Sequence, residues 1–382
     1  MDLNERIRNR LESIERAGEK RSMTEPRGID LSSNDYLCLA EDPRLKEAML
    51  DGVRRYGVGS TASRLLRGHR EVFERAESEF AKFKGTQRSL YFATGYQANL
   101  GIFQTFLEEG DVVFSDELNH ASIIDGIRLS KAEKVIFEHG HAEDLRTKIE
   151  SANVQGERFI VTESLFSMDG DVAPLDEYAA ICRDTGTNLI VDEAHAVGIY
   201  GKKGSGLIEE AGIGDEVLLS VNTAGKALGV AGAFVSGAEW AIEYLIQRCR
   251  SFIFSTAPPP ALAYALTKSI GIVEIEEDRR NRLIELCGKF SLLLGEAGFV
   301  VPERPTQIVP VVIGRSEDAT AVASELQEAG FDIRAIRPPT VPEGTARLRI
   351  SLNVGVSEAD LERLVVLLRN AVTKQIETGF FV

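Results

Sequence analysis

The sequence lacks three features that would point to common classes of protein. Its 382 residues include only four cysteines, Cys38, Cys182, Cys249 and Cys287, and none is close enough to another to give a metal-ligand spacing. Lysine and arginine total 44 against 59 acidic residues, and this net charge of −15 disfavours a general nucleic-acid binder. No run of about eighteen apolar residues occurs, so we expect no membrane-spanning helix. Because the cysteines are dispersed, we also expect no metal centre.

A secretory signal is also missing. The first twenty residues are charged throughout and contain no apolar core of the kind that a signal peptide needs. Together with the dispersed cysteines, this favours a reducing, cytoplasmic compartment. The composition that is present, 43% hydrophobic and 27% charged residues, is ordinary for a globular protein and excludes a disordered or fibrous chain.

The pattern of apolar residues divides the chain into three parts. Residues 1–45 predict an N-terminal helix and arm, residues 46–285 a large α/β domain, and residues 286–382 a smaller α+β domain. From residue 88 short apolar runs alternate with helical stretches, which predicts a mostly parallel sheet with helices on both faces. Such a sheet binds its ligand at the carboxyl ends of its strands.

Several helices are expected outside this alternation. Apolar residues at helical spacing predict helices over residues 4–20, 43–56 and 70–84. Residues 261–299 predict one long helix or two, after a break at FSTAPPP.

Lys226 is the first of five polar positions that follow predicted strands. It lies in the glycine-punctuated segment VNTAGKALGVAG, where a lysine could form a Schiff base with a carbonyl group or could simply be solvated. Thr223 offers a hydroxyl three residues earlier, and Gly225 lets the backbone approach a ligand closely. Alone, this spacing is a weak signal.

Asp192 and His195 form the second position. Asp192 ends the apolar run NLIV, so its carboxylate could face the protonated ring nitrogen of pyridoxal phosphate (PLP) and make the ring an electron sink. His195, three residues later, could reach the phenolic oxygen of the same ring. The alternative is an aspartate that caps a loop and a half-buried structural histidine.

Three further junctions carry polar residues. Gly95 and Tyr96 lie at a predicted helix N-terminus, which suits a phosphate group, or they form an ordinary turn. His120 follows another strand, where its flat ring could stack on a cofactor, and Glu163 and Ser167 follow the next one. Five junctions at one edge of a sheet, each suited to part of one cofactor, favour a single PLP site.

As a set, these motifs resemble the α-oxoamine synthase family of PLP-dependent acyltransferases. The matching segments run in family order from residue 32 to residue 260 and read SSNDYL, GSTASRLLRGH, ATGYQAN, NHASIIDG, TESLFSMDGDVAPL, VDEAHAVGIYGKKGSG, TAGKALG and FSTAPPP. AIRPPTVPEGTARLRISL (335–352) extends the match almost to the end. The resemblance implies the PLP-dependent aminotransferase-like fold, fold type I, and decarboxylative condensation of an amino acid with an acyl thioester.

The C-terminal segment narrows the substrates that the resemblance implies. It is most similar to family members of biotin biosynthesis, which condense L-alanine with pimeloyl-CoA or a pimeloyl carrier protein. Members that use glycine or serine with another acyl-CoA are the alternative. A third is a binding protein that kept the fold and lost the chemistry, against which the intact Lys226, Asp192, His195 and Arg349 argue.

The resemblance also implies a role for each matching residue around the cofactor. Lys226 would hold PLP covalently and, once displaced by the amino acid, would remove its Cα proton. The residues implied to bind the cofactor are Lys226, Asp192, His195, His120, Gly95, Tyr96, Thr223 and Ser167. Thr256 would reach the phosphate of the neighbouring subunit, which implies a homodimer with shared active sites.

On the substrate side, the resemblance assigns the amino-acid carboxylate to Arg349. Strand alternation puts Arg347 and Arg349 on the same face, so one of them could be a solvated surface charge instead. Asn34 and His120 would lie on the amino-acid side, and Arg21 and Thr340 on the acyl side.

Three features depart from the family pattern. The segment between Arg21 and SSNDYL is shorter than usual and lacks a short hairpin. Cys38 stands where glycine is more common, and the glycine run after Lys226 is diluted to GVAG. None of these changes removes a chemical group from the predicted cofactor site.

Overall fold

A computed structural model describes residues 2–16 and 18–377, which fold into two compact units. The large unit comprises residues 37–167 and 171–281, and the small unit comprises the described residues of 1–36, 168–170 and 282–382. Each unit has its own sheet and its own buried core.

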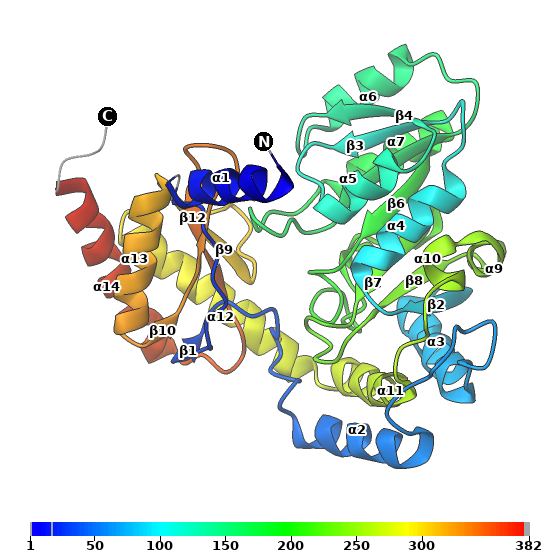
Figure 1. Cartoon of the computed structure of the whole chain (residues 1–382), viewed down its shortest axis with the longest axis horizontal. Coiled ribbons are helices and arrows are strands. Elements are labelled where there is room, and N and C mark those ends of the chain that lie inside the picture. Colours follow the sequence, from blue (N-terminus) through cyan, green and yellow to red (C-terminus); the bar gives the residue numbers. More distant parts are fainter. Residues whose placement is uncertain (1, 17, 378–382) are drawn as a thin grey trace. The chain divides into compact units, whose positions relative to one another are not determined.

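A seven-stranded sheet forms the centre of the large unit, in the order β2-β8-β7-β6-β5-β3-β4 (Figure 1). Its strands are β2 (Arg88–Phe92), β3 (Val112–Asp116), β4 (Glu133–Phe137), β5 (Arg158–Glu163), β6 (Asn188–Asp192), β7 (Val217–Thr223) and β8 (Ala233–Gly237). Only β8 is antiparallel to its neighbours, β2 and β7, and all other pairs are parallel. The prediction of a mostly parallel sheet is therefore confirmed.

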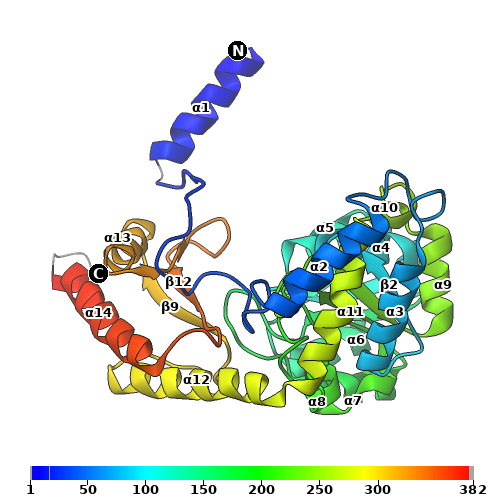
Figure 2. The ribbon, with the colours of Figure 1, turned by 90° about the horizontal axis from the view of Figure 1, so that it is seen from below.

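Helices cover this sheet, and most residues of its central strands are buried. The helices of the large unit are α2 (Pro43–Tyr56), α3 (Glu71–Lys84), α4 (Gly95–Phe106), α5 (Ala121–Arg128), α6 (Ala142–Ser151), α7 (Leu175–Thr185), α8 (Leu207–Ala211), α9 (Glu239–Arg248), α10 (Arg250–Ile253) and α11 (Pro260–Ile275), with a 3-10 turn η1 (Gly214–Glu216). α2 and α3 lie beside α11, as Figure 2 shows, whereas α4, α5, α9 and α10 pack together in a second group. All five residues of β3 and of β8 are buried, as expected for strands covered on both faces.

The core between α4, α5, α9 and the sheet is assembled from residues far apart in the sequence. Ile102 and Phe103 of α4 and Ile123 of α5 pack with Val161 of β5 and Val221 of β7, and all five side chains are fully buried. This packing fixes α4 against the carboxyl edge of the sheet, where its N-terminus begins.

The small unit is built on an antiparallel sheet in the order β11-β12-β9. Its elements are α1 (Leu3–Arg16), β1 (Ile29–Asp30), β9 (Ile308–Gly314), α13 (Ser316–Glu328), β10 (Phe331–Asp332), β11 (Ala335–Ile336), β12 (Ala346–Ser351) and α14 (Glu358–Glu377), and α12 (Glu277–Glu296) contains the boundary between the units. β1 pairs with β10 in parallel, which ties the N-terminal arm to this unit.

Most of the predicted helices are confirmed, and one is too long. Residues 261–299 form two helices, α11 and α12, with the break at Glu276. The helix predicted over residues 4–20 ends at Arg16, and Gly18 adopts a left-handed φ of 68°, which a continuing helix does not allow. None of the described helices is both long and apolar enough to cross a membrane.

Candidate functional site

The polar residues predicted at the strand ends gather at the carboxyl edge of the large unit's sheet. Glu163 and Asp192 are register partners at the ends of β5 and β6, so they are direct neighbours. Thr223 ends β7, and His120 caps the N-terminus of α5 just after β3. The expectation that these junctions share one edge is confirmed.

Lys226 and His195 are brought into contact by two loops of this edge. Lys226 Nζ lies 2.8 Å from His195 Nε2, although 31 residues separate them in the sequence. Thr223 Oγ1 donates to the carbonyl oxygen of Ala194 at 3.1 Å and so joins the same two loops again. His195 is only 4% exposed, whereas Lys226 is half-buried and open enough to meet a ligand.

Asp192 is buried, and its two oxygens accept hydrogen bonds from different elements. The Ala194 N–H donates to Oδ1 at 2.9 Å, and Asn99 Nδ2 of α4 donates to Oδ2 at 2.8 Å. The same Asn99 amide lies 2.9 Å from Ser122 Oγ, which lies 2.7 Å from His120 Nδ1. One chain of hydrogen bonds thus runs from the carboxylate to the imidazole.

Asn99 and Ser122 were missed by the sequence analysis, although both connect predicted site residues. Asn99 does carry a signal: it is an amide on the buried face of an otherwise apolar helix segment, ANLGIF, and its side chain therefore needs partners. Ser122 carries none, because a serine in the first turn of a helix is ordinary.

His120 is held as a neutral ring. Burial lowers its pKa, and the positive charge of Lys226 lowers it further against the opposing effect of Asp192. The Ser122 backbone N–H donates to Nδ1 at 3.2 Å, which requires that Nδ1 carry no proton. A flat, neutral ring with its proton on Nε2 suits the predicted stacking role.

Glu163 is buried beside Asp192, and its Oε1 has no hydrogen-bond partner among the described residues. Burial raises the pKa of Glu163 to about 8, and the nearby charge of Asp192 acts in the same direction. Glu163 is therefore protonated at neutral pH and adds no second negative charge directly beside Asp192.

The N-terminus of α4 forms an anion-binding corner against the end of β7. Thr94 caps the helix by accepting from the Gln97 N–H at 3.1 Å, which leaves the Gly95 and Tyr96 N–H groups without partners in the helix. A Cβ on Gly95 would lie 2.5 Å from Thr223 Cγ2, so only glycine allows this approach. Gly95, Tyr96 and Thr223 are thus brought together as predicted, in a corner that suits a phosphate group.

Tyr96 also approaches His120. Its ring meets the imidazole edge to face, with centroids 6.4 Å apart and planes at 76°. Its hydroxyl donates to the Asp125 carboxylate of α5, which orients the ring. Tyr96 is therefore placed between the predicted phosphate corner and the predicted stacking residue.

The diluted glycine run keeps glycine where the backbone needs it. Gly229 has a φ of 65°, and a Cβ there would lie 2.6 Å from Leu39 Cβ. Cys38, just before that contact, has a φ of 51°, in the left-handed region that favours glycine. The segment that bears Cys38 thus packs on the loop of Lys226, and the strain of a non-glycine residue there is accommodated.

Two further predicted cofactor residues lie in loops of the large unit. Ser167 is half-buried in the loop between β5 and α7. Thr256 is exposed in the segment between α10 and α11 and lines a small pocket with Ala93 and Gln97, which flank the residues of the phosphate corner. Exposure is what a residue that serves a neighbouring subunit requires.

In the small unit, Arg349 and Asn34 are brought together as predicted. Arg349 is 7% exposed; its Nη1 donates to Ser351 Oγ at 2.6 Å and its Nη2 to Asn34 Oδ1 at 3.0 Å. The Tyr36 hydroxyl also donates to Asn34 Oδ1, at 2.9 Å. Burial raises the pKa of Tyr36 to about 12, so this hydroxyl keeps its proton and remains a donor.

The expectation that Arg347 or Arg349 is a solvated surface charge is wrong. Arg347 is also 7% exposed, and it forms an ion pair with Asp169 and donates to the Met168 carbonyl oxygen at 3.4 Å. Strand alternation places both arginines on one face, but it cannot show that this face is buried. Arg347 fastens residues 168–170 to the small unit.

Arg21 and Thr340 meet in the small unit despite the short segment that follows Arg21. Arg21 Nη2 donates to Thr340 Oγ1 at 3.2 Å, although 319 residues separate them. Both residues line a cavity of about 560 Å³ beside α13 and β11. The resemblance assigned both residues to the acyl side, and the structure places them in contact.

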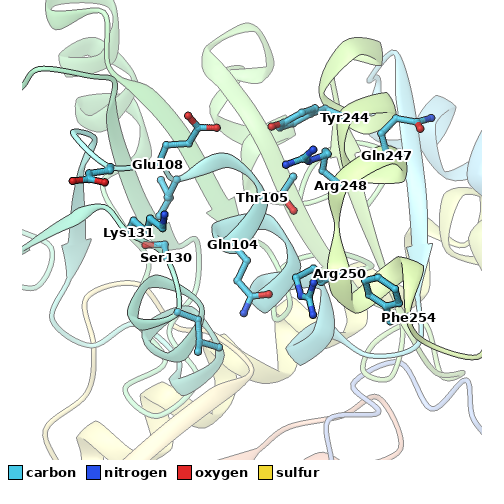
Figure 3. A pocket seen from close by; sticks show the side chains of 13 residues that line it. Gln104, Thr105, Glu108, Ser130, Lys131, Tyr244, Gln247, Arg248, Arg250 and Phe254 are labelled. Atoms are coloured by element: carbon cyan, nitrogen blue, oxygen red, sulfur yellow. The ribbon is translucent and has the colours of Figure 1, made fainter.

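The large unit contains a cavity of similar size that none of the predicted site residues lines. It measures about 620 Å³ and lies at the C-terminal ends of α4 and α9, next to α10 (Figure 3). Its 13 lining residues, among them Thr105, Lys131, Tyr244 and Arg250, include none of the predicted site residues. Cavity volume alone would therefore have pointed to the wrong place.

The groups at the sheet edge fit PLP as a set. Lys226 supplies an amine for an aldehyde, Asp192 a buried carboxylate for a ring nitrogen, and the start of α4 free N–H groups for a phosphate. The orphaned Glu163 Oε1 is a buried polar atom that a ligand group could satisfy. Among the described residues, no cluster of three or more histidine, cysteine, aspartate or glutamate side chains could hold a metal ion.

Comparisons with known proteins point to one family. The model of the class I and II aminotransferases matches residues 26–368. The 8-amino-7-oxononanoate synthase of Methylococcus capsulatus is 44% identical over 348 residues, covering 91% of this chain and 90% of that protein. The crystal structure of the 8-amino-7-oxononanoate synthase of Francisella tularensis has a TM-score of 0.80 and 32% identity, covering 91% of this chain and 99% of that one.

A serine palmitoyltransferase is also similar over nearly the whole chain. The enzyme of S. paucimobilis, with a bound PLP–myriocin aldimine, has a TM-score of 0.91 and 28% identity, covering 98% of this chain and 99% of that one. This likeness confirms the expected fold type I architecture.

Glu163 allows a test of this site that does not depend on activity. The folded-state pKa of about 8 lies above the ordinary value of 4.5, so wild-type stability falls as pH rises through this window, by at most about 1.4 kcal/mol per pH unit. Glu163→Gln removes that loss, so the stability of the variant relative to wild type should rise from pH 5 to pH 8. Urea unfolding midpoints measure it. Glu133→Gln, at an exposed position in β4, is the control, and a pH-independent difference for Glu163→Gln contradicts the assignment.

Proposed function

Since this chain belongs to the class I and II aminotransferase family and is 44% identical to an 8-amino-7-oxononanoate synthase, we propose that it is a PLP-dependent acyltransferase of this kind. It would condense L-alanine with a pimeloyl thioester to give 8-amino-7-oxononanoate, carbon dioxide and the free thiol, in biotin biosynthesis. The observation that carries the proposal is the contact of Lys226 with His195 beside the buried Asp192. A cytoplasmic location stays a prediction.

When bound, PLP supplies an electron sink for the negative charge that develops at the amino-acid Cα. Lys226 Nζ is the amine that holds the cofactor and, once released, the base that accepts the Cα proton. The contact with His195 at 2.8 Å holds this amine at the sheet edge. Asp192, fixed by Asn99 and Ala194, stabilises a proton on the ring nitrogen, and the protonated Glu163 adds no second charge.

The remaining cofactor contacts follow from the other groups of this edge. Gly95, Tyr96 and Thr223 would bind the phosphate, and the neutral His120 would stack on the ring. Ser167 would lie beside the cofactor, in the loop that follows β5. His195 would also bind the phenolic oxygen of the cofactor, since its ring lies beside Lys226.

Substrate binding is assigned to residues of the small unit. The guanidinium of Arg349 can bind a carboxylate through two parallel hydrogen bonds, and Asn34 and Ser351 orient it. Holding the amino-acid carboxylate in this way fixes the direction of its Cα–H bond. Arg21 and Thr340 are assigned to the acyl donor.

A homodimer with shared active sites is part of the proposal. Thr256 is exposed, and the preceding Phe254 is 73% exposed; Leu66, in the loop before α3, is 77% exposed. In the proposed dimer, the partner chain would cover these exposed apolar side chains. Sedimentation should give about twice the chain mass of 41.9 kDa, and an active monomer would contradict this part.

A product assay tests the proposed function. The protein, reconstituted with PLP, should release carbon dioxide and form 8-amino-7-oxononanoate from L-alanine and pimeloyl-CoA, because each required group is present. Lys226→Ala should lose turnover by at least about 1,000-fold, since it lacks both the anchor and the base. Glycine, serine and a panel of acyl-CoAs are the comparison substrates. Preference for glycine or serine would favour another α-oxoamine synthase, and no product with any pair would favour a non-catalytic binding protein.

Arg349 and Arg347 provide a matched pair of buried arginines on one strand. Arg349→Ala should weaken alanine binding by about 2–5 kcal/mol, because the substrate carboxylate loses its two hydrogen bonds to the guanidinium. The affinity for the cofactor should stay unchanged. Arg347→Ala removes the partner of Asp169 and should lower the unfolding midpoint instead. Alanine KM, cofactor titration and urea unfolding separate the two effects. The reverse pattern would assign the carboxylate to Arg347.

A further inference from the structure

The N-terminal arm of the small unit, residues 18–28, is held mainly by side chains of residues 330–340. The guanidinium of Arg337 donates to the carbonyl oxygen of Gly18 and, at 3.4 Å, to that of Lys20. Arg334 donates to Thr24 Oγ1. Regular backbone pairing begins only at β1, so side-chain hydrogen bonds rather than strand pairing hold residues 18–28 in place.

Arg337 connects the arm and the acyl-side pair in a closed circuit. Its side chain holds the Lys20 carbonyl, directly before Arg21, and its own carbonyl oxygen accepts from the Thr340 N–H at 3.0 Å. Arg21 then donates to the Thr340 hydroxyl at 3.2 Å. Loss of the Arg337 side chain would therefore release the arm beside Arg21, while the Thr340 N–H keeps its backbone partner.

The cavity beside this circuit is electropositive. Its basic lining residues are Lys20, Arg21, Arg334 and Arg337, against a single acidic one, Glu19. Lys20 is paired with Glu15 and Arg334 with Asp332, whereas no carboxylate of the described chain forms an ion pair with Arg21 or Arg337. Two positive charges without an acidic partner suit a ligand group that is negatively charged.

We propose that Arg337 is a positioning residue that fixes the N-terminal arm and thereby places Arg21 to bind the negatively charged end of the acyl donor. This role rests on the proposed function, because it requires an acyl donor with an anionic end. It also explains how a shortened arm keeps Arg21 on Thr340: the bonds of Arg337 replace those of a longer backbone connection. Arg337 acts through Arg21 and need not touch the reacting atoms.

Steady-state kinetics of the PLP-loaded enzyme with pimeloyl-CoA and L-alanine test this role. Arg337→Ala should raise the KM for pimeloyl-CoA at least tenfold and change the KM for alanine and the affinity for PLP less than twofold. Arg337→Lys should restore part of the effect, because an ammonium can hold one of the two carbonyls. Arg369→Ala, which removes an exposed arginine of α14, is the control and should behave as wild type.

Limited trypsin digestion provides a readout that does not need turnover. Trypsin can cut the arm after Lys20, Arg21 and Arg27, and Arg337→Ala removes no cutting site because Pro338 follows residue 337. Cleavage within the arm should be at least fivefold faster in Arg337→Ala than in wild type or Arg369→Ala. Unchanged cleavage, or a fall in kcat with an unchanged KM for pimeloyl-CoA, overturns the role of Arg337.

The proposed function and the role of Arg337 can fail separately. A wild-type enzyme that makes no product contradicts the proposed function and this role with it. An active wild type with an unaffected Arg337→Ala variant contradicts the role of Arg337 alone.

Discussion

A buried carboxylate at the end of a central strand is the constraint on which the predicted cofactor site depends. Asp192 lies at the end of β6, 6% exposed, and its charge must be stabilised without bulk water. Asn99 and the Ala194 N–H satisfy its oxygens, and Asn99 can do so only because α4 packs against this edge. The packing of α4 therefore sets both the ring-nitrogen partner and the phosphate corner at its own N-terminus.

Two titratable neighbours of Asp192, Glu163 and His120, carry no charge at neutral pH. Glu163 is protonated because burial and Asp192 raise its pKa to about 8, and His120 is neutral because burial lowers its pKa. Lys226 is the basic group of this edge, in contact with His195. Asp192 beside an amine and two neutral groups is the charge pattern expected where a protonated ring is to be held and a proton moved.

The sequence revealed strand ends better than side-chain partners. Lys226, Asp192, His195 and His120 were identifiable because each lies at or within a few residues of the end of an apolar run, and parallel strands share an edge. Asn99 and Ser122 act from helices, where periodicity shows a buried face but not the partners across it. The burial of Arg347 depends on Asp169, 178 residues away, which no local pattern reports. Two other local features depend on single backbone angles. α1 ends at Arg16, just before Gly18 with its left-handed φ of 68°, and Cys38 has a left-handed φ of 51°.

The central claim is that Lys226 is the residue that carries the cofactor. Reconstituting the protein with PLP, reducing it with borohydride and mapping the tryptic peptides by mass spectrometry tests it directly. The account predicts one modified peptide, with the added mass on Lys226, and none in Lys226→Ala. Modification of any other lysine in place of Lys226, or an unmodified wild type, would contradict it.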